Sequence, residues 1–240
     1  MNNKVFILLF LTYISLVSSS KAPFITKCKW DDAKCLKESS QAAIPLFAEG
    51  LPDLNVAKQE PLIIKHVDAS TSNLKLIITD VEVNGLKNCE ARKITRDIEN
   101  SKIIVKIRCS VDFKGKYDMK GQLFILPIEG NGDLTAHIRK MLITAEVDIM
   151  DKTGKDGKTH WNVKSWRHSF DLQDKSDVRF ENLFPDNELL RKSTEELIAS
   201  NGNDVINEIG HPVIKSVVAA VINNIKKFFD TVPLEDLVLD

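Results

Sequence analysis

Histidine and cysteine are the side chains here best suited to metal binding or nucleophilic catalysis, and the histidine spacing supports neither. The five histidines are scattered along the chain: His66, His137, His160, His168 and His211. His160 and His168 would share one face of a strand but lie too far apart along it to bind one metal ion. Gly-x-Ser-x-Gly, His-Glu-x-x-His and phosphate-binding glycine loops are all missing from the sequence. We therefore predict a protein that is not an enzyme and uses no metal or cofactor. A hydrolase of hydrophobic esters is the weaker alternative, since the fold would have to assemble its Ser or Cys, His and carboxylate.

The four cysteines predict disulfide bonds, because an even number in a secreted chain is typical of a disulfide framework. Cys28 and Cys35 close a short loop, and their spacing fits zinc poorly, since zinc ligands usually come in closer pairs with histidines nearby. Cys89 and Cys109 are equidistant from residue 99, the centre of a predicted hairpin turn, which would place them face to face within disulfide range. A register shift of one residue would put their sulfurs on opposite faces, so the sequence leaves the second bond open.

Residues 1–20 predict a signal peptide and therefore a secreted protein. Lys4 precedes the apolar run 5–17, and small residues then allow cleavage after Ser20. The alternative, an uncleaved anchor, is disfavoured because spanning a bilayer takes roughly 20 apolar residues. We expect no stable membrane insertion. The net charge of −1 and the lack of basic clusters with interleaved aromatic residues argue against a nucleic-acid partner. Residues 21–240 show no linker and predict a single domain.

The elements that must position any functional residue change in character along the chain. Residues 32–49 predict a helix, ended by Gly50 and Pro52, with a bend or break at Pro45. Alternating strands follow from about residue 60 to 180. The clearest is 102–113, whose apolar face consists of Ile103, Val105, Ile107, Cys109, Val111 and Phe113. Its other face is mostly charged, which is typical of an antiparallel sheet with one face in water.

Three further segments extend the predicted sheet. The same alternation recurs in Met141, Ile143, Ala145, Val147 and Ile149, after a predicted hairpin turn at 130–132. A weaker pattern places Ile77, Thr79, Val81 and Val83 on one face. The run 123–128 is apolar throughout and does not alternate, so we predict a strand buried on both faces, either in an ordinary core or as part of a container for an apolar ligand.

The last third has helical periodicity. A helix is predicted from 185 to about 199, an interruption at 200–203, and then a helix from about 204 to 230 that would be roughly 40 Å long. Apolar side chains cover too much of its circumference for a surface helix, so another element must wrap it. The order of helix, strands and helices predicts an α+β fold in which a curved antiparallel sheet surrounds the long helix.

Four segments in this order give the chain a family resemblance. They are "GLPDLNVAKQEPL" (50–62), "VEVNGLKN" (81–88), "GKYDMKGQLFILPIEGNGD" (115–133) and "KKFFDTVPLEDL" (226–237). Together with the two cysteines near the start of the mature chain they resemble the takeout/juvenile hormone binding protein family of insects, over nearly the whole mature chain.

The resemblance implies a long C-terminal helix wrapped by a strongly curved antiparallel sheet, with an elongated apolar tunnel between them. It implies a carrier in haemolymph or another extracellular fluid, and Cys28 and Cys35 match the family's N-terminal disulfide. Cys89 and Cys109 are not part of that pattern. Gly202 stands where takeout-like sequences tend to have an aromatic residue, which predicts a looser junction between the C-terminal helices. Juvenile hormone itself is not implied, because the sequence lies closer to the takeout branch.

The resulting functional hypothesis is a carrier of a juvenile-hormone-like isoprenoid, a fatty acid or a related lipid. Candidate wall residues, chosen by the face on which they lie, are Phe47, Leu51, Val105, Ile107, Val111, Phe113, Met141, Ile143, Val147, Val213, Val217 and Val221. A receptor is a further candidate partner. The alternative is a secreted protein-interaction module with a filled core and no ligand. The two differ in whether an apolar cavity runs along the helix.

Overall fold

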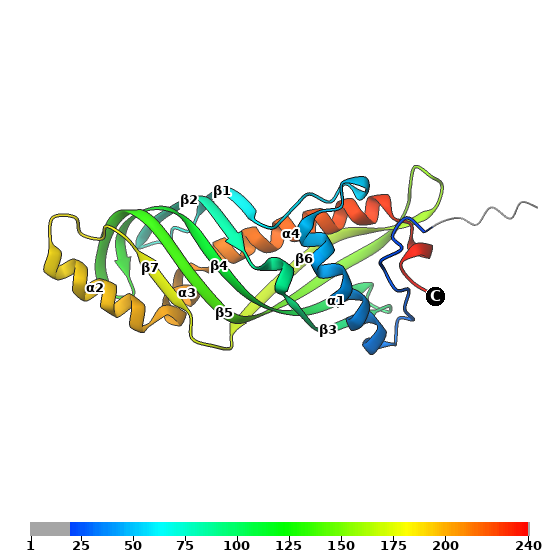
Figure 1. Ribbon diagram of the computed structural model, residues 1–240, viewed down its shortest axis with the longest axis horizontal. Helices are drawn as coiled ribbons and strands as arrows, with labels where there is room; N and C mark the ends of the chain where they lie inside the picture. Colours follow the sequence, from blue (N-terminus) through cyan, green and yellow to red (C-terminus); the bar gives the residue numbers. More distant parts are fainter. Residues whose placement is uncertain (1–19, 240) are drawn as a thin grey trace, which may run out of the picture.

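The fold consists of one antiparallel sheet and four helices, as described for residues 20–239 by a computed structural model (Figure 1). The predicted signal peptide, apart from Ser20, lies outside the described residues. The strands are β1 (Leu62–Asp68), β2 (Leu74–Asn84), β3 (Glu90–Asp97), β4 (Lys102–Leu123), β5 (Leu126–Thr153), β6 (Thr159–Leu172) and β7 (Asp177–Phe180). The helices are α1 (Ala33–Glu49), α2 (Glu188–Ser200), α3 (Gly202–Ile209) and α4 (His211–Thr231), with short 3₁₀ turns at Pro52–Leu54, Leu86–Asn88 and Leu234–Asp236.

The sheet curls around α4, which confirms the predicted fold class. Its strand order is β1-β2-β4-β5-β6, with β3 also paired to β4 and β7 to β5. Helix α4 packs against both β1 and β6, the two ends of that order. A flat sheet could not bring both end strands to one helix, so the long strands β4 and β5 must bend around it, as Figure 1 shows.

Helix α1 begins and ends as predicted, with Asp32 as its N-cap and Gly50 following its last residue. Pro45 does not break it: the helix is continuous from Ala33 to Glu49. The side chain of Gln41 covers the open edge of β3. Its amide donates to the Cys89 carbonyl at 3.2 Å and accepts from the Ala91 N–H at 2.7 Å, so it satisfies edge groups that would otherwise invite pairing with another chain.

The predicted strand at 123–128 and the predicted turn at 130–132 are both wrong, and the two errors are linked. Leu123 pairs with Leu126, so Phe124 and Ile125 form the loop between β4 and β5, and the Ile125 side chain is 87% exposed. The glycines at 130 and 132 lie inside β5 instead. A Cβ on Gly130 would come within 2.8 Å of the Asn182 carbonyl oxygen, so glycine here serves the close approach of the chain after β7.

The predicted helix at 204–230 is also wrong, because it is two helices bent by 69°. Helix α3 ends at Ile209 and α4 starts at His211, with Pro212 in its first turn. Proline has no N–H and its ring collides with the carbonyl four residues earlier, so the first helix cannot continue through this position. At 1.5 Å per residue, the 21 residues of α4 span about 30 Å.

The junction of α2 and α3 is tighter than its sequence predicts. Gly202 is buried, and a Cβ there would lie 2.2 Å from the Ser176 carbonyl oxygen. The Asn203 side chain accepts from the Ser176 N–H at 2.9 Å and donates to the Asp174 carbonyl at 3.1 Å. The absent side chain therefore lets α3 lie directly on the segment before β7.

Among the described residues, no single helix is long and apolar enough to cross a bilayer; α3 and α4 would meet that requirement only as a bent pair.

Candidate ligand-binding interior

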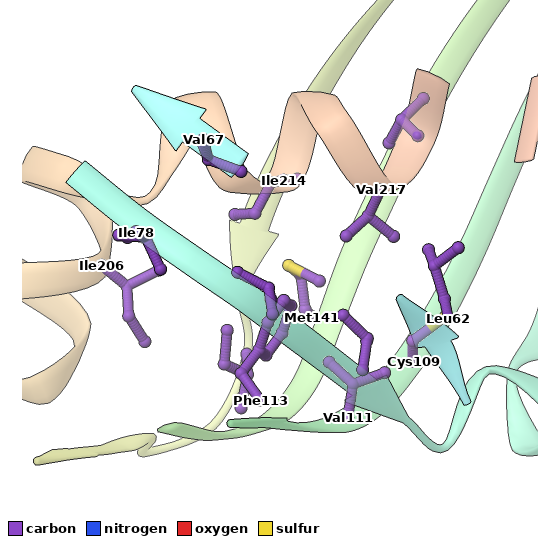
Figure 2. Packing of buried hydrophobic residues seen from close by; sticks show 14 of the residues in the cluster. Leu62, Val67, Ile78, Cys109, Val111, Phe113, Met141, Ile206, Ile214 and Val217 are labelled. Atoms are coloured by element: carbon purple, nitrogen blue, oxygen red, sulfur yellow. The ribbon is translucent and has the colours of Figure 1, made fainter. Parts of the chain in front are cut away.

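Apolar side chains pack between the curled sheet and α4, and most of the predicted wall residues belong to or contact this core. Val111, Phe113, Met141, Val147 and Val217 belong to the buried core. A second group is half-buried and packs against it: Phe47, Leu51, Ile107, Ile143 and Val213. Figure 2 shows Val111, Phe113 and Met141 from the sheet close to Ile214 and Val217 from α4. Val105 and Val221 are half-buried but are not part of this cluster.

The alternation of β4 explains why the sheet contributes so many of these residues. Val105, Ile107 and Cys109 lie opposite Ala145, Ile143 and Met141 of β5. Directly opposed side chains occupy the same face of an antiparallel sheet, so two independent alternating patterns combine into one continuous apolar surface. This part of the interior was readable from the sequence because both strands keep their period through it.

An aromatic cluster at the C-terminal end of α4 is a feature that the sequence analysis missed. The Phe47 ring lies 5.0 Å from that of Phe228, and Phe24 lies 6.2 Å from Phe228. Phe229 meets Trp161 of β6 at 5.3 Å. Helix α1, the N-terminal segment, β6 and α4 therefore meet in a single set of rings at this end of the interior. The adjacent Phe228 and Phe229 were the available signal.

The opposite end, near α2, combines a buried tyrosine with a small apolar cleft. The Tyr117 hydroxyl donates to the Glu181 carbonyl at 2.7 Å, and its ring lies 4.9 Å from that of Phe180. Burial raises the pKa of Tyr117, so the phenol stays protonated. The cleft is formed by the β4–β5 loop, α2 and α3; its lining includes Phe124, Leu126, Leu197, Ile198 and Val205. Ile198 and Val205 belong to the buried core, so the cleft lies directly over it.

Polar groups within the interior are satisfied by backbone partners. Asn224 of α4 is 4% exposed; its amide donates to the Ala57 carbonyl at 2.7 Å, and its oxygen accepts from the Ala57 N–H at 3.2 Å. Ser176 is the exception within residues 20–239, since its buried hydroxyl has no partner. An interior of this kind offers a ligand apolar contacts and few charges.

Both cysteine pairs form disulfides: Cys28–Cys35, as predicted, and Cys89–Cys109, which the sequence left open. The second bond depends on a register shift in the hairpin. Near the turn Asp97 faces Lys102, a pairing that is not centred on residue 99. An extra residue of β3 between Ala91 and Lys93 then shifts the pairing by one, so that Glu90 faces Arg108. That irregularity restores the symmetry about residue 99 and brings the two cysteines to a Cα separation of 4.4 Å. These bonds also leave no cysteine thiolate for nucleophilic chemistry.

The buried histidine is held by structural partners. His160 Nδ1 lies 2.8 Å from the Phe229 carbonyl oxygen, and Nε2 lies 3.0 Å from Asp156 Oδ1. Nδ1 therefore ties β6 to the end of α4, and Nε2 ties β6 to the turn between β5 and β6. The pKa of Asp156 is lowered to about 2, first by the backbone N–H of Lys158 and then by hydrogen bonds from His160 and Lys21. This cluster holds elements together and presents no open site for a reacting group.

His168 occupies a different environment, between β6 and the start of α4. Partial burial is the main cause that lowers its pKa, and the nearby His211 and Lys215 add to the effect. The His211 ring lies 4.7 Å from that of Phe170. Within residues 20–239, no group of three or more His, Cys, Asp or Glu side chains is placed to hold a metal ion.

Comparison with known proteins agrees with this architecture. The family model described as haemolymph juvenile hormone binding protein (JHBP) matches residues 6–239. The circadian clock-controlled protein daywake of Drosophila melanogaster is 27% identical over 190 residues, which cover 72% of this chain and 71% of that protein. Daywake of Drosophila yakuba is 24% identical over 191 residues, covering 75% and 73%. The crystal structure of Epiphyas postvittana Takeout 1 matches with a TM-score of 0.85 and 26% identity, covering 90% of this chain and 100% of that one.

Proposed function

The chain belongs to the haemolymph juvenile hormone binding protein family, whose members carry hydrophobic ligands, and on that premise we propose that it is a secreted carrier of an elongated apolar molecule. The ligand would be an isoprenoid, a fatty acid or a related lipid, held between the curled sheet and α4. Binding would involve no chemical change of the ligand.

The observation that supports this most is the continuous apolar surface that β4, β5 and α4 turn toward one another. A ligand that buries about ten methylenes there gains up to roughly 8 kcal/mol at about 0.8 kcal/mol each. This corresponds to about micromolar affinity before the costs of ordering are included. Burial alone is therefore sufficient for a carrier, and the few polar groups of the interior would set specificity.

The apolar cleft beside α2 suggests where the interior opens. Its lining combines Leu197 and Ile198 of α2 with Phe124 of the β4–β5 loop and Leu126 at the start of β5. Helix α2 packs against β7 and α3 and has one buried residue, Ile198, so its displacement would disturb little of the core. We propose that the ligand passes between α2 and this loop.

Native mass spectrometry of protein secreted from insect cells, followed by solvent extraction, tests the carrier directly. A stoichiometric lipid or isoprenoid in the extract is the expected result. Protein that leaves the cells empty and also takes up no fluorescent fatty acid would instead favour the secreted interaction module with a filled core.

A pair of variants on α4 locates the site. Val217→Arg places a charge in the interior and should abolish uptake of a fluorescent fatty acid, whereas Asn223→Arg places the same side chain on the exposed face and should bind normally. Val217→Phe, which stays apolar but fills space, should fold and still reduce uptake. Wild-type uptake by a folded Val217→Arg and by Val217→Phe would remove α4 from the binding wall.

A further inference from the structure

A second concavity, whose lining includes several charged side chains, lies on the outer face of the sheet. Its volume is about 610 Å³, within the range of roughly 300 to 1,000 Å³ typical of small-molecule sites. It crosses β2, β4, β5 and β7, and its lining consists of Asn84, Asp112, Phe113, Lys114, Thr135, Ala136, His137, Arg139, Asp177 and Arg179. We call this concavity the outer groove.

Strand register places three side chains of the outer groove in one row. Lys114 of β4 is directly opposite Thr135 of β5, and Thr135 is directly opposite Arg179 of β7. All three are exposed. Opposed residues lie about 5 Å apart at Cα, so the two cations flank the Thr135 hydroxyl from either side, with their own Cα atoms about 10 Å apart. Both side chains are long enough to meet above it.

The carboxylates of the neighbouring row already have hydrogen-bond partners. Asp112, His137 and Asp177 are directly opposed across β4, β5 and β7, and Asp112 pairs with His137. Asp177 accepts from Arg139 at 2.9 Å. Glu82 of β2 lies directly opposite Lys114 and accepts a hydrogen bond from the Asn84 side chain at 2.7 Å. Within residues 20–239, Lys114 and Arg179 themselves form no ion pair. Two cations without partners therefore share one groove with a hydroxyl group.

We propose that the outer groove binds a phosphate monoester group. The guanidinium of Arg179 would take two phosphate oxygens through its forked N–H donors, Lys114 would supply a second positive charge, and the Thr135 hydroxyl would donate to a third oxygen. The carboxylates of the groove, Asp112 and Asp177, are held by His137 and Arg139. Lys114 and Arg179 therefore remain available to bind the phosphate dianion. The phosphate monoester belongs either to a small soluble molecule or to a lipid headgroup.

This site is independent of the interior because it uses the opposite face of the same strands. Along β5 and β7, Ile138 and Val178 alternate with residues of the outer groove and belong to the buried core. Phe113, which contributes to the groove's lining, is itself a buried core residue. Substituting Lys114 and Arg179 therefore leaves the proposed apolar wall untouched.

The test measures binding of two probes to the full secreted chain. Glycerol 3-phosphate is titrated by NMR with glycerol as the blank, and vesicles containing phosphatidic acid are compared with pure phosphatidylcholine vesicles by co-sedimentation. The Lys114→Gln/Arg179→Gln double variant is compared with wild type and with Lys164→Gln, a matched loss of charge at an exposed site on β6. Uptake of a fluorescent fatty acid is measured on every variant.

The proposal is supported if wild type and Lys164→Gln both bind one of the probes and the double variant binds it at least about tenfold more weakly. Added salt should also weaken this binding. Glycerol 3-phosphate binding identifies a soluble ligand, and vesicle binding alone identifies a headgroup. Failure of wild type to bind either probe, or equal binding by the double variant, would overturn the proposal. Fatty-acid uptake should be unchanged in the double variant, so loss of the groove and loss of the carrier function are separable.

Discussion

Asn224 holds α4 in its place inside the sheet, and its replacement should have a measurable cost. Asn224→Ala removes both hydrogen bonds to the backbone of Ala57. Each such bond contributes about 1 kcal/mol net, and the vacated space adds a packing loss. We expect the free energy of unfolding to fall by about 2–3 kcal/mol. Ala57 itself is exposed, so water can reach part of its backbone in the variant. The larger cost of leaving a fully buried polar group without a hydrogen bond therefore does not apply.

Urea unfolding followed by circular dichroism measures this, with the slope of free energy against urea expected to stay constant. Asn223→Ala is the matched control, since Asn223 is the exposed neighbour on the same helix; it should change stability by less than about 0.5 kcal/mol. Asn224→Asp keeps the acceptor for the Ala57 N–H but sets a carboxylate oxygen against the Ala57 carbonyl, so it should also destabilise at neutral pH. Equal stability of Asn224→Ala and Asn223→Ala would refute the view that this amide anchors the helix.

Three further predictions concern packing and pH. Gly202→Ala should lower stability by about 1–3 kcal/mol, because its Cβ would lie 2.2 Å from the Ser176 carbonyl oxygen; an unchanged urea midpoint would contradict the close packing. The pKa of His168 is lowered in the folded state, so the unfolded chain takes up the proton first as pH falls below about 6.5, and stability present above that pH declines. His168→Gln should therefore lose less stability than wild type between pH 7 and 5 in thermal melts, and parallel curves would count against it. The pKa of Asp156 is lowered to about 2, so its stabilising effect is present above about pH 4 and is lost as pH falls toward 2; Asp156→Asn should show a shallower acid transition in that window.

Where a strand keeps one period, the sequence was sufficient to predict its inner face. β4 alternates from Cys109 to Leu123, and residues 102–108 are all half-buried. Ile103, Ile107, Cys109, Val111 and Phe113 of the predicted face belong to or pack against the core. In β2 the prediction was half right. Val81 and Val83 are buried, but before them the buried residues are Leu74, Leu76 and Ile78. The register shifts between Thr79 and Glu82, and a shift of this kind moves the inner face by one residue.

Two signals misled because tertiary contacts overrode local composition. The residues of 123–128 are apolar enough for a buried strand, yet the hairpin turns at Phe124 and Ile125. The Gly-Asn-Gly sequence at 130–132 has the composition of a turn, yet Gly132 is there because the Glu181 carbonyl passes within 2.6 Å of where its Cβ would be. Nothing near these residues in the sequence specifies a partner fifty positions away. The apolar inner faces of the strands were easier to predict than these loops because they depend on repeated alternation.

The segments that identify the family hold the frame together, and this explains why they do not reveal the ligand. The Glu60 carboxylate, in the first segment, accepts from the backbone N–H groups of Gly85, at 2.8 Å, and Lys87, at 3.1 Å, in the second. Gly85 adopts a φ of 102°, and a Cβ there would lie 2.7 Å from the Ser110 carbonyl oxygen, so this position requires glycine. In the last segment, Asp236 accepts from the backbone N–H of Lys21 at 3.0 Å. Such ties fix how the sheet closes around α4 whatever lies inside. The apolar side chains on the inner face make no such bonds, so they can change in size and shape while the frame is retained.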